Sequence, residues 1–290
     1  MNDDPRLITA GTRIAAVIGD PVRHSLSPTM HNAAFAHLGL DWVYVAFNVS
    51  TGNGARALEA MRVCGWGGAS VTMPLKEEMV RACDELTPEA ERVGSVNCVV
   101  PRSDAGLLGA STDGEGFIRS LREAGHDTAG RSVLILGAGG AARSVIAAMG
   151  DLGAIVRVAA RKRAAAERAA ALAPSGEIVS WDELSVVVPE MQMIVNATSM
   201  GMDGEMVLDP EWLQDHHVVI DLVYHPRVTP LLAAAQERGI PTVGGLGMLV
   251  HQAALAFELW TGCSAAIEVM RAAALNFSSR MVDTQGAGRH

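Results

Sequence analysis

The sequence predicts an α/β protein of two domains, one of them built on a doubly wound, mostly parallel sheet. A short β-branched run, Ser132–Leu136, is followed by a glycine-rich turn and then by a helical stretch. A second apolar run, Ile155–Ala159, follows at the spacing of a βαβ unit. The chain has 290 residues, of which 49% are hydrophobic and 19% charged, so it is long enough and apolar enough to bury two cores.

The turn after the first of these runs has the pattern of a dinucleotide-binding loop. Gly137, Gly139 and Ala142 form G-x-G-x-x-A. In that pattern the first glycine permits the sharp turn, the second lets a pyrophosphate approach the backbone, and the small third residue lets the helix lie close to the strand. The helix N-terminus also presents free N–H groups that suit a phosphate. Such turns also occur for structural reasons alone, but the strand before and the helix after favour dinucleotide binding.

The end of the second strand indicates which dinucleotide binds. An NAD site has Asp or Glu about 20 residues beyond the glycines, where it bonds the ribose 2′-hydroxyl. This chain has Ala160-Arg161-Lys162-Arg163 there, without an acid. Cationic side chains match a 2′-phosphate by charge and, for arginine, by geometry. The alternative is a solvated basic start to the next helix. We predict NADP(H) rather than NAD(H).

Charge and composition exclude several classes of function. A net charge of −9 argues against nucleic acid or an anionic membrane as a partner. No apolar run reaches membrane-spanning length, and residues 1–12 lack a signal-peptide core. The four cysteines form no C-x-x-C pair and no cluster with histidine. We therefore expect neither structural zinc nor a disulfide framework, and we expect a cytoplasmic protein with reduced thiols and no metal.

The pattern of elements places a domain boundary near residue 113, because the dinucleotide-binding unit begins soon after it. In the first domain we expect strands at 13–18, 43–47, 69–72, 94–100 and 107–111, and helices from Ser27 onward, at 55–62 and from Pro74 onward. In the second we expect further strands at 193–195 and 218–222, and helices from Phe117, at 164–173 and around 231–235. The last helices are expected at 249–260 and 265–275, and the polar tail 278–290 is expected to fray.

Several polar residues lie where ligands bind in such folds. Alternating βα units predict a parallel sheet with right-handed crossovers, whose ligands lie beyond the carboxyl ends of the strands. Residues 196–199 and Tyr224 lie at such ends. Ser27 is a good N-cap and Pro28 a good first helical residue, which leaves Ser25 free to hold a carboxylate with Ser27. Each candidate also has a purely structural interpretation.

Lys76 and Asp113 each have both a functional and a structural interpretation. A lysine in a first helical turn opposes the helix dipole, a local conflict typical of functional sites, although a surface lysine is the commoner outcome. Asp113 is equally suited to cap the helix that follows it.

Taken together, these stretches resemble the shikimate dehydrogenase family. The resemblance is an ordered series that covers nearly the whole chain, from about Gly19 to Gly262. Its members are Gly19-Asp20-Pro21, His24 to Pro28, His31-Asn32, Val71 to Lys76, Gly94 to Asn97, Thr112-Asp113-Gly114, Gly137 to Ala141, Asn196 to Ser199, Tyr224-His225-Pro226 and Met248 to Gln252.

The resemblance implies an α/β substrate domain of residues 1–112 plus 246–290 and a Rossmann-type NADP-binding domain of residues 113–245. It implies reversible reduction of 3-dehydroshikimate to shikimate with NADPH. We expect an enzyme that acts on a small molecule, as a monomer or homodimer. The resemblance implies that Lys76 and Asp113 are the catalytic pair. It further implies that Ser25, Ser27 and Tyr224 hold the substrate carboxylate, and that Thr72, Lys76, Asn97, Asp113 and Gln252 surround the ring hydroxyls. The implied NADP(H) contacts are Gly137, Ala138, Gly139, Gly140, Ala141, Ala160, Arg161, Lys162, Thr198, Leu222 and Gly245.

The implied roles suit the chemistry of the residues. Ketone reduction needs a hydride on carbon and a proton on oxygen, and a lysine ammonium can polarise the carbonyl and donate that proton.

Three positions depart from the family pattern. Ser70 and Ser111 stand where the family usually has asparagine, and Ala160-Arg161-Lys162 stands for the usual Asn-Arg-Thr. The two serines leave open a quinate/shikimate dehydrogenase or a relative acting on an amino analogue. A sensor that binds NADP(H) or a shikimate-like acid without catalysis is a further alternative, which the presence of both Lys76 and Asp113 disfavours. A two-domain folate dehydrogenase fits the architecture but not the Ser25 and Ser27 pair.

Overall fold

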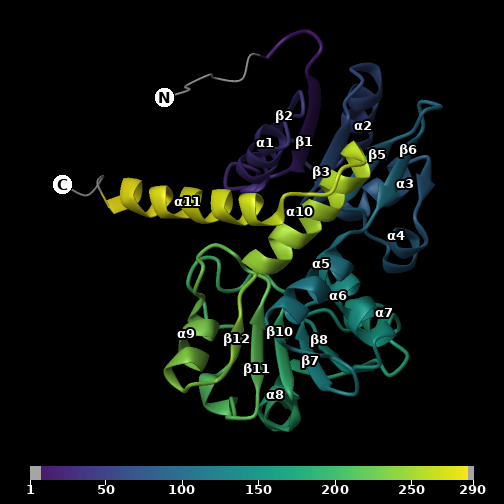
Figure 1. Ribbon diagram of the computed structural model, residues 1–290. Coiled ribbons are helices and arrows are strands. Elements are labelled where there is room, and N and C mark those ends of the chain that lie inside the picture. The colour runs from purple at the N-terminus through teal and green to yellow at the C-terminus, as the bar shows by residue number, and fades with distance from the viewer. Residues whose placement is uncertain (1–7, 287–290) are drawn as a thin grey trace. The chain divides into compact units, whose positions relative to one another are not determined.

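A computed structural model describes residues 8–286, with side chains described through Phe277. The chain divides into two compact units, unit 1 (Met1–Thr112 and Ala253–His290) and unit 2 (Asp113–Gln252). Helix α10 (Leu246–Thr261) contributes its residues up to Gln252 to unit 2 and the rest to unit 1. Figure 1 labels the helices and strands. Most of the segment 1–12, which was expected to lack a signal-peptide core, lies outside the described residues.

Unit 1 is a mixed six-stranded sheet with helices on both faces. The strand order is β2-β1-β3-β5-β6-β4, in which β1, β2 and β3 are parallel while β5 runs antiparallel to both β3 and β6. Its elements are β1 (Arg13–Gly19), α1 (Ser27–His37), β2 (Trp42–Asn48), α2 (Gly54–Val63), β3 (Gly68–Val71), η1 (Leu75–Glu77), α3 (Met79–Ala82), β4 (Glu85–Leu86), α4 (Pro88–Val93), β5 (Cys98–Pro101), β6 (Leu107–Ala110), the second part of α10, and α11 (Ile267–Gly286).

The register of unit 1 places the ends of its strands together. Ile18 pairs with Val71, and Ser70 pairs with Cys98. Because β5 is antiparallel to β3, the start of β5 lies beside the carboxyl end of β3. The expected strand at 94–100 begins only at Cys98, so Asn97 lies in the turn that enters it.

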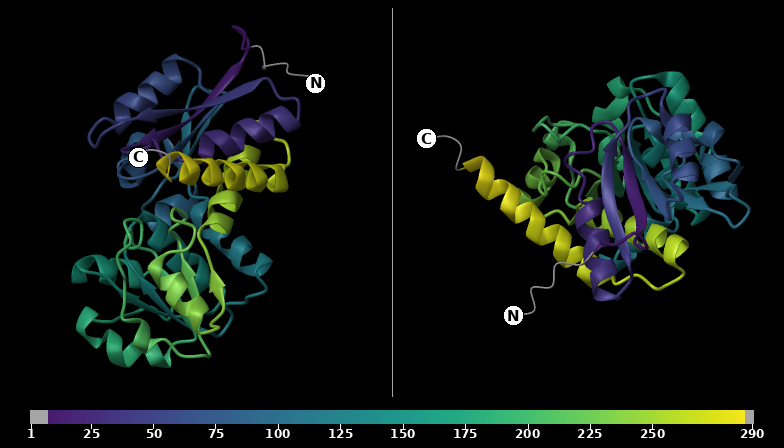
Figure 2. Two further views of the ribbon diagram at one scale, coloured as in Figure 1. Left: turned by 90° about the vertical axis from the view of Figure 1, so that its left-hand side faces the viewer. Right: turned by 90° about the horizontal axis from the view of Figure 1, so that it is seen from above.

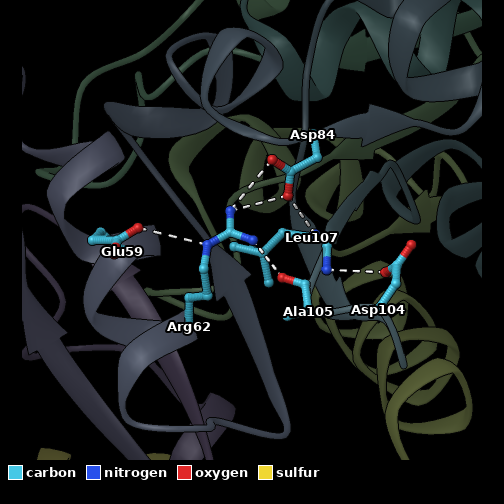
Figure 3. Close-up of polar contacts among 7 residues, drawn as sticks. Glu59, Arg62, Asp84, Asp104, Ala105 and Leu107 are labelled. Atoms are coloured by element: carbon cyan, nitrogen blue, oxygen red, sulfur yellow. Dashed lines mark hydrogen bonds and ion pairs between the residues drawn. The ribbon is translucent and has the colours of Figure 1, made fainter.

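One face of the unit 1 sheet packs on α2, α3 and α4 through an aliphatic core that includes Leu58, Met61, Leu75 and Met79. At the rim of this face Arg62 joins α2 to the segments around β4 and β6 (Figure 3). Its guanidinium contacts Asp84 at 3.0 Å, Glu59 at 3.5 Å and the carbonyl of Ala105. Asp84 also accepts the N–H of Leu107 at 2.7 Å. That bond and Arg62 lower the pKa of Asp84.

The other face carries an aromatic core, covered by α1, α10 and α11; α11 lies alongside α1 (Figure 2). The ring of His31 stacks on Tyr44 at 4.4 Å and lies 5.2 Å from the ring of Trp260. Phe35 and Phe257 complete the cluster, with ring centroids 5.1 Å apart. Asn32 pairs with both the N–H and the C=O of Tyr44 at 2.8 Å, which satisfies backbone groups on the edge strand β2.

This aromatic core is expected to make the protein acid-sensitive. His31 is fully buried, and neither ring nitrogen has a partner among the described residues. Burial lowers the pKa of His31 to about 3, so the unfolded chain takes up a proton below about pH 6.5 while the folded chain does not. Stability contributed by neutral His31 is therefore lost as pH falls. One such group costs about 2 kcal/mol between about pH 7.5 and pH 5.

The variant His31→Phe keeps the stacked ring and has no proton to take up. We expect its unfolding free energy, measured in urea at both pH values, to fall less than that of the wild type by that amount. Equal losses in the two proteins would contradict the assignment. Taking the difference between them cancels other groups such as His217, whose pKa burial lowers to about 4.

Unit 2 is a wholly parallel six-stranded sheet, ordered β12-β11-β10-β7-β8-β9. This is the doubly wound order, in which β7 and β10 flank the point where the winding reverses. Its elements are α5 (Asp113–Glu123), β7 (Ser132–Leu136), α6 (Gly140–Asp151), β8 (Ile155–Ala159), α7 (Arg163–Ala170), β9 (Glu177–Ile178), η2 (Trp181–Glu183), α8 (Leu184–Val187), η3 (Val188–Glu190), β10 (Met193–Asn196), η4 (Pro210–Trp212), β11 (Val218–Asp221), α9 (Pro230–Glu237), β12 (Thr242–Val243) and the start of α10.

Alternate residues of β7 enter two separate cores. Val133 and Ile135 pack with α5, α6 and α7, whereas Leu134 and Leu136 pack with α8 and α9. Figure 1 shows α6 and α7 on one side of the sheet and α9 on the other. A strand buried on both faces reads as a continuous apolar run, which is why the sequence predicted it with correct bounds.

Several element bounds differ from the predicted ones. The helix expected from Phe117 begins at Asp113, so that residue lies in the first turn. The tail expected to fray from 278 is helical through Gly286, and residues 287–290 lie outside the described part of the chain. In residues 8–286 no helix is both long enough and apolar enough to cross a membrane.

Candidate active site

The glycine turn after β7 is shaped for close approach of a ligand. Gly137 has φ +117°, and a Cβ there would lie 2.8 Å from the carbonyl oxygen of Ala197. Gly139 precedes α6 with nothing within 4 Å of where its Cβ would be. The first turn of α6 contains no acidic residue and receives no side-chain cap. The turn thus offers backbone N–H groups and open space to a phosphate, as the sequence predicted.

The loop after β10 lies against that turn. The N–H of Ala197 donates to the carbonyl of Leu136 at 2.8 Å. Thr198 is held by Asn196, whose side-chain oxygen accepts the Thr198 hydroxyl at 2.7 Å and its N–H at 3.1 Å. The winding-reversal point of the sheet therefore has Gly137 on one side and Thr198 on the other.

The basic segment after β8 is the third segment beside the point where the winding of the sheet reverses. β8 is in register with β7, with Ala159 opposite Leu136, so Ala160 follows directly beside the glycine turn. Arg161 and Lys162 are exposed, and no acidic residue of α7 lies in its first turn. The residues present therefore fit the phosphate groups and the 2′-phosphate of NADP(H).

The end of β11 meets the start of α10. A Cβ on Gly245 would lie 2.3 Å from the carbonyl oxygen of Leu222, so these two predicted contacts are neighbours. Tyr224 follows on the same loop, and burial raises its pKa. It lines a pocket of about 530 Å³ together with Arg227, Gln236, Thr242 and Leu246.

In unit 1 the predicted substrate residues gather beyond β1 and β3. A Cβ on Gly19 would lie 2.4 Å from the Thr72 methyl group, so the turn after β1 and the segment after β3 are in close contact. Lys76 lies on the 3₁₀ turn η1, not on an α-helix, and its carbonyl accepts the N–H of Val96 at 3.0 Å. Thr72, Lys76 and Asn97 therefore lie near the carboxyl ends of β1 and β3.

The predicted cap role of Ser27 was wrong. Helix α1 begins at Ser27 itself, with Leu26 at the N-cap position and no side-chain cap. Instead the hydroxyl of Ser25 accepts the N–H of Ser27 at 3.3 Å. Ser27 is buried, and its hydroxyl and that of Ser70 approach the buried Tyr44 hydroxyl without completing a hydrogen bond. Burial raises the pKa of Tyr44. Ser25 and Ser27 thus lie two positions apart at the start of α1.

Asn97 has a hydrogen-bond partner, Thr112, that the sequence analysis missed. Its side-chain nitrogen donates to the Thr112 hydroxyl at 2.8 Å, and its oxygen accepts the Thr112 N–H at 2.7 Å. Both residues are buried. Asn97 therefore fixes the backbone immediately before Asp113 as well as being a candidate ligand residue.

Asp113 and Gln252 lie where α5 and α10 cross. A Cβ on Gly116 would lie 2.7 Å from the backbone nitrogen of Gln252. Asp113 is three residues before Gly116, which places it on the same face of α5. The Gln252 side chain donates to the carbonyl of Leu249 at 2.8 Å.

Sequence reasoning also missed Asp221, Asn196 and Thr229 as a connected group. All three are fully buried and joined by hydrogen bonds at the ends of β10 and β11. No sequence motif indicates this group, because its members are 25 and 8 residues apart. Among the described residues no group of three or more histidine, cysteine, aspartate and glutamate side chains could hold a metal ion.

These features define a class: a two-unit α/β protein whose second unit is a Rossmann-type sheet with a phosphate-binding turn.

Comparison with models of protein families agrees with this class. The shikimate dehydrogenase substrate binding domain matches residues 17–99, and the shikimate 5′-dehydrogenase C-terminal domain matches residues 245–275. The chain is 43% identical to a shikimate dehydrogenase (NADP(+)) of Moorella thermoacetica, covering 91% of this chain and 92% of that protein. It is 42% identical to one of Rhodospirillum rubrum, covering 93% and 99%. The chain belongs to the shikimate dehydrogenase family.

Solved structures agree with that assignment. A shikimate dehydrogenase from Thermus thermophilus, in complex with NADP(H) and shikimate, matches with a TM-score of 0.82 and 36% identity, covering 91% of this chain and 99% of that one. A quinate dehydrogenase from Corynebacterium glutamicum, in complex with NAD, matches with a TM-score of 0.85 and 30% identity, covering 91% and 99%.

Proposed function

We propose that this protein catalyses the reversible reduction of 3-dehydroshikimate to shikimate with NADPH. The observation that carries the proposal is identity above 40%, over nine-tenths of the chain, to relatives named shikimate dehydrogenase (NADP(+)). The phosphate-binding turn and the exposed cations after β8 support it independently.

We assign cofactor binding to residues 113–245. The phosphates lie on Gly137, Ala138, Gly139, Gly140 and Ala141, and the 2′-phosphate on Ala160, Arg161 and Lys162. Thr198 is a further cofactor contact, and Leu222 and Gly245 line the nicotinamide end. When bound, NADPH supplies the hydride.

We assign substrate binding to residues 1–112 plus 246–290, with Tyr224 added from the other domain. Ser25, Ser27 and Tyr224 hold the carboxylate, since hydroxyls donate to a carboxylate without burying a second charge. Thr72, Asn97 and Gln252 hold ring hydroxyls. Lys76 donates the proton to the carbonyl oxygen and Asp113 orients it.

A broader quinate/shikimate dehydrogenase is the second candidate. Ser70 and Ser111 are shorter than the asparagines usual in the family and lack an amide donor. Ser70 is on β3 directly before the Val71–Thr72 segment, so its size bears on the room beside the ring. Quinate carries one more hydroxyl than shikimate.

The test is the initial rate of oxidation of shikimate and of quinate, each with NADP⁺ and with NAD⁺. We expect shikimate with NADP⁺ to be the strongly preferred pair. Comparable quinate turnover would assign the protein to the broader class. Tight NADP⁺ binding without turnover of either acid would overturn the proposal in favour of a sensor.

A double variant tests the residues proposed to bind the 2′-phosphate. Replacing Arg161 and Lys162 by alanine removes charge-assisted contacts, so we expect the NADP⁺ over NAD⁺ preference in kcat/KM to fall by about 10–100-fold. Arg168→Ala removes an exposed cation from α7, the helix that follows these two residues, and serves as the matched control. An unchanged preference in the double variant would place the 2′-phosphate elsewhere.

We further propose that the enzyme acts in the cytoplasm on small molecules, as a monomer or homodimer. Acidic charge and the absence of a membrane-spanning helix in residues 8–286 are consistent with this.

A further inference from the structure

Asp221 is a buried acid that the proposed reaction does not use. It is the last residue of β11 and has no exposed surface. Its Oδ1 accepts the Asn196 side-chain amide at 3.0 Å and the Val223 N–H at 2.9 Å. Its Oδ2 accepts the Thr229 hydroxyl at 2.7 Å. Among residues 8–277, whose side chains are described, no cationic side chain pairs with it.

A carboxylate in this position is costly. Burial without a cation disfavours the charged form, and burial raises the pKa of Asp221. An apolar residue of similar volume often serves stability as well or better. The carboxylate therefore needs an explanation other than fold stability, and its contacts provide one.

Those contacts reach two loops that carry proposed site residues. Through Asn196 the acid reaches the cofactor loop, residues 196–201, because Asn196 also holds Thr198 and donates to the Met200 carbonyl at 2.9 Å. Through Val223 and Thr229 it holds both ends of the substrate loop, residues 222–229, which carries Tyr224.

A carboxylate suits this position because it only accepts hydrogen bonds. Three donors converge on Asp221 from three backbone segments, and a carboxylate can satisfy all of them. Asparagine would keep one oxygen for Asn196 and Val223 but turn an NH₂ group toward Thr229. The Thr229 hydroxyl already accepts the Leu232 N–H at 3.3 Å as the cap of α9, so its own proton would lose its acceptor.

We propose that Asp221 is a positioning residue that fixes the cofactor loop and the substrate loop as one piece. This rests on the proposed function, since the loops matter through the cofactor and substrate roles of Thr198 and Tyr224. One oxygen holds the cofactor loop and the start of the substrate loop, and the other holds the far end of the substrate loop.

The test separates the two oxygens. Asp221→Ala removes every contact, so the Kd for NADP⁺ and the KM for shikimate should each rise by about tenfold, the equivalent of one buried hydrogen bond. Asp221→Asn breaks the contact to Thr229 and keeps the others, whereas Thr229→Val breaks that contact and also removes the cap of α9. They should raise the KM for shikimate while leaving the Kd for NADP⁺ within about twofold of the wild type.

Thr128→Val is the matched control, because Thr128 is buried in unit 2 and its hydroxyl has no partner among the described residues. A purely structural role predicts a smaller active fraction in Asp221→Ala with unchanged Kd and KM, and that result would overturn the proposal. So would an equal rise in NADP⁺ Kd in Asp221→Asn and Asp221→Ala. If Asp221→Ala does not fold, the Asn and Thr229 variants decide.

The NADP⁺ titration contains no substrate. Absence of shikimate turnover in the wild type would therefore defeat the proposed function while the comparison of NADP⁺ affinities still tests Asp221.

Discussion

Replacing Lys76 by alanine is expected to lower kcat for shikimate oxidation by about 10²–10⁴-fold, the usual contribution of a positioned general acid or base. The KM for NADP⁺ should change little, because Lys76 belongs to unit 1 and the proposed cofactor residues belong to unit 2. The measurement is steady-state kinetics with shikimate and NADP⁺, together with NADP⁺ affinity by titration.

The composition of the chain sharpens this expectation. Of 23 cationic residues only two are lysines, Lys76 and Lys162, and the other 21 are arginines. Arginine stays protonated in proteins, whereas lysine can release its proton. Lysine at position 76 is thus the residue type that proton transfer requires.

Two variants test this reasoning. Lys76→Arg keeps the charge but cannot release a proton, so its kcat should fall nearly as far as in Lys76→Ala. Lys162→Ala removes the other lysine and should affect the NADP⁺ parameters instead. High activity in Lys76→Arg would mean that charge alone suffices, and near-native turnover in Lys76→Ala would remove Lys76 from the mechanism.

The parts of the fold predicted well from sequence are those whose cause is local. The bounds of β7 and β8 agree with the predicted runs, because strands buried on both faces are continuously apolar and end at turn residues. The glycine turn is likewise specified by its own backbone needs, as the positive φ of Gly137 shows.

The start of α5 was missed because its glycines have a tertiary cause. Gly114 and Gly116 suggest a loop, since glycine weakens helices. In the structure a Cβ on Gly114 would lie 2.7 Å from the Ser144 carbonyl oxygen, and one on Gly116 would meet α10. The small residues allow neighbouring helices to approach closely, which a single sequence does not reveal.

The candidate site shows the same division. Residues 196–199 and Tyr224 lie at or just after the ends of β10 and β11, as the sequence predicted. The hydrogen bonds that hold the candidate site residues were not foreseen, because Asn97 meets Thr112, and Asp221 meets Asn196, only through the sheet.

Replacing Trp260 by alanine is expected to have the largest effect on stability. Trp260 is 6% exposed on α10, and its indole lies over Gly68, where a Cβ would come within 2.5 Å of the ring. The indole N–H donates to the Val99 carbonyl at 3.0 Å, so one side chain joins the helix to β3 and β5. Loss of such a residue typically costs about 3–5 kcal/mol. Urea unfolding at neutral pH measures it.

Two further variants separate the contributions of Trp260. Trp260→Phe keeps a ring but leaves the Val99 carbonyl without its donor, and it should cost about 1–3 kcal/mol beyond the lost area. Leu259→Ala alters the preceding residue, which is 48% exposed, and should stay within about 0.5 kcal/mol of the wild type. If Trp260→Ala costs no more than Leu259→Ala, the indole does not anchor α10 to the unit 1 sheet. The helix would then owe its place to the buried side chains of Ala253, Ala256 and Phe257.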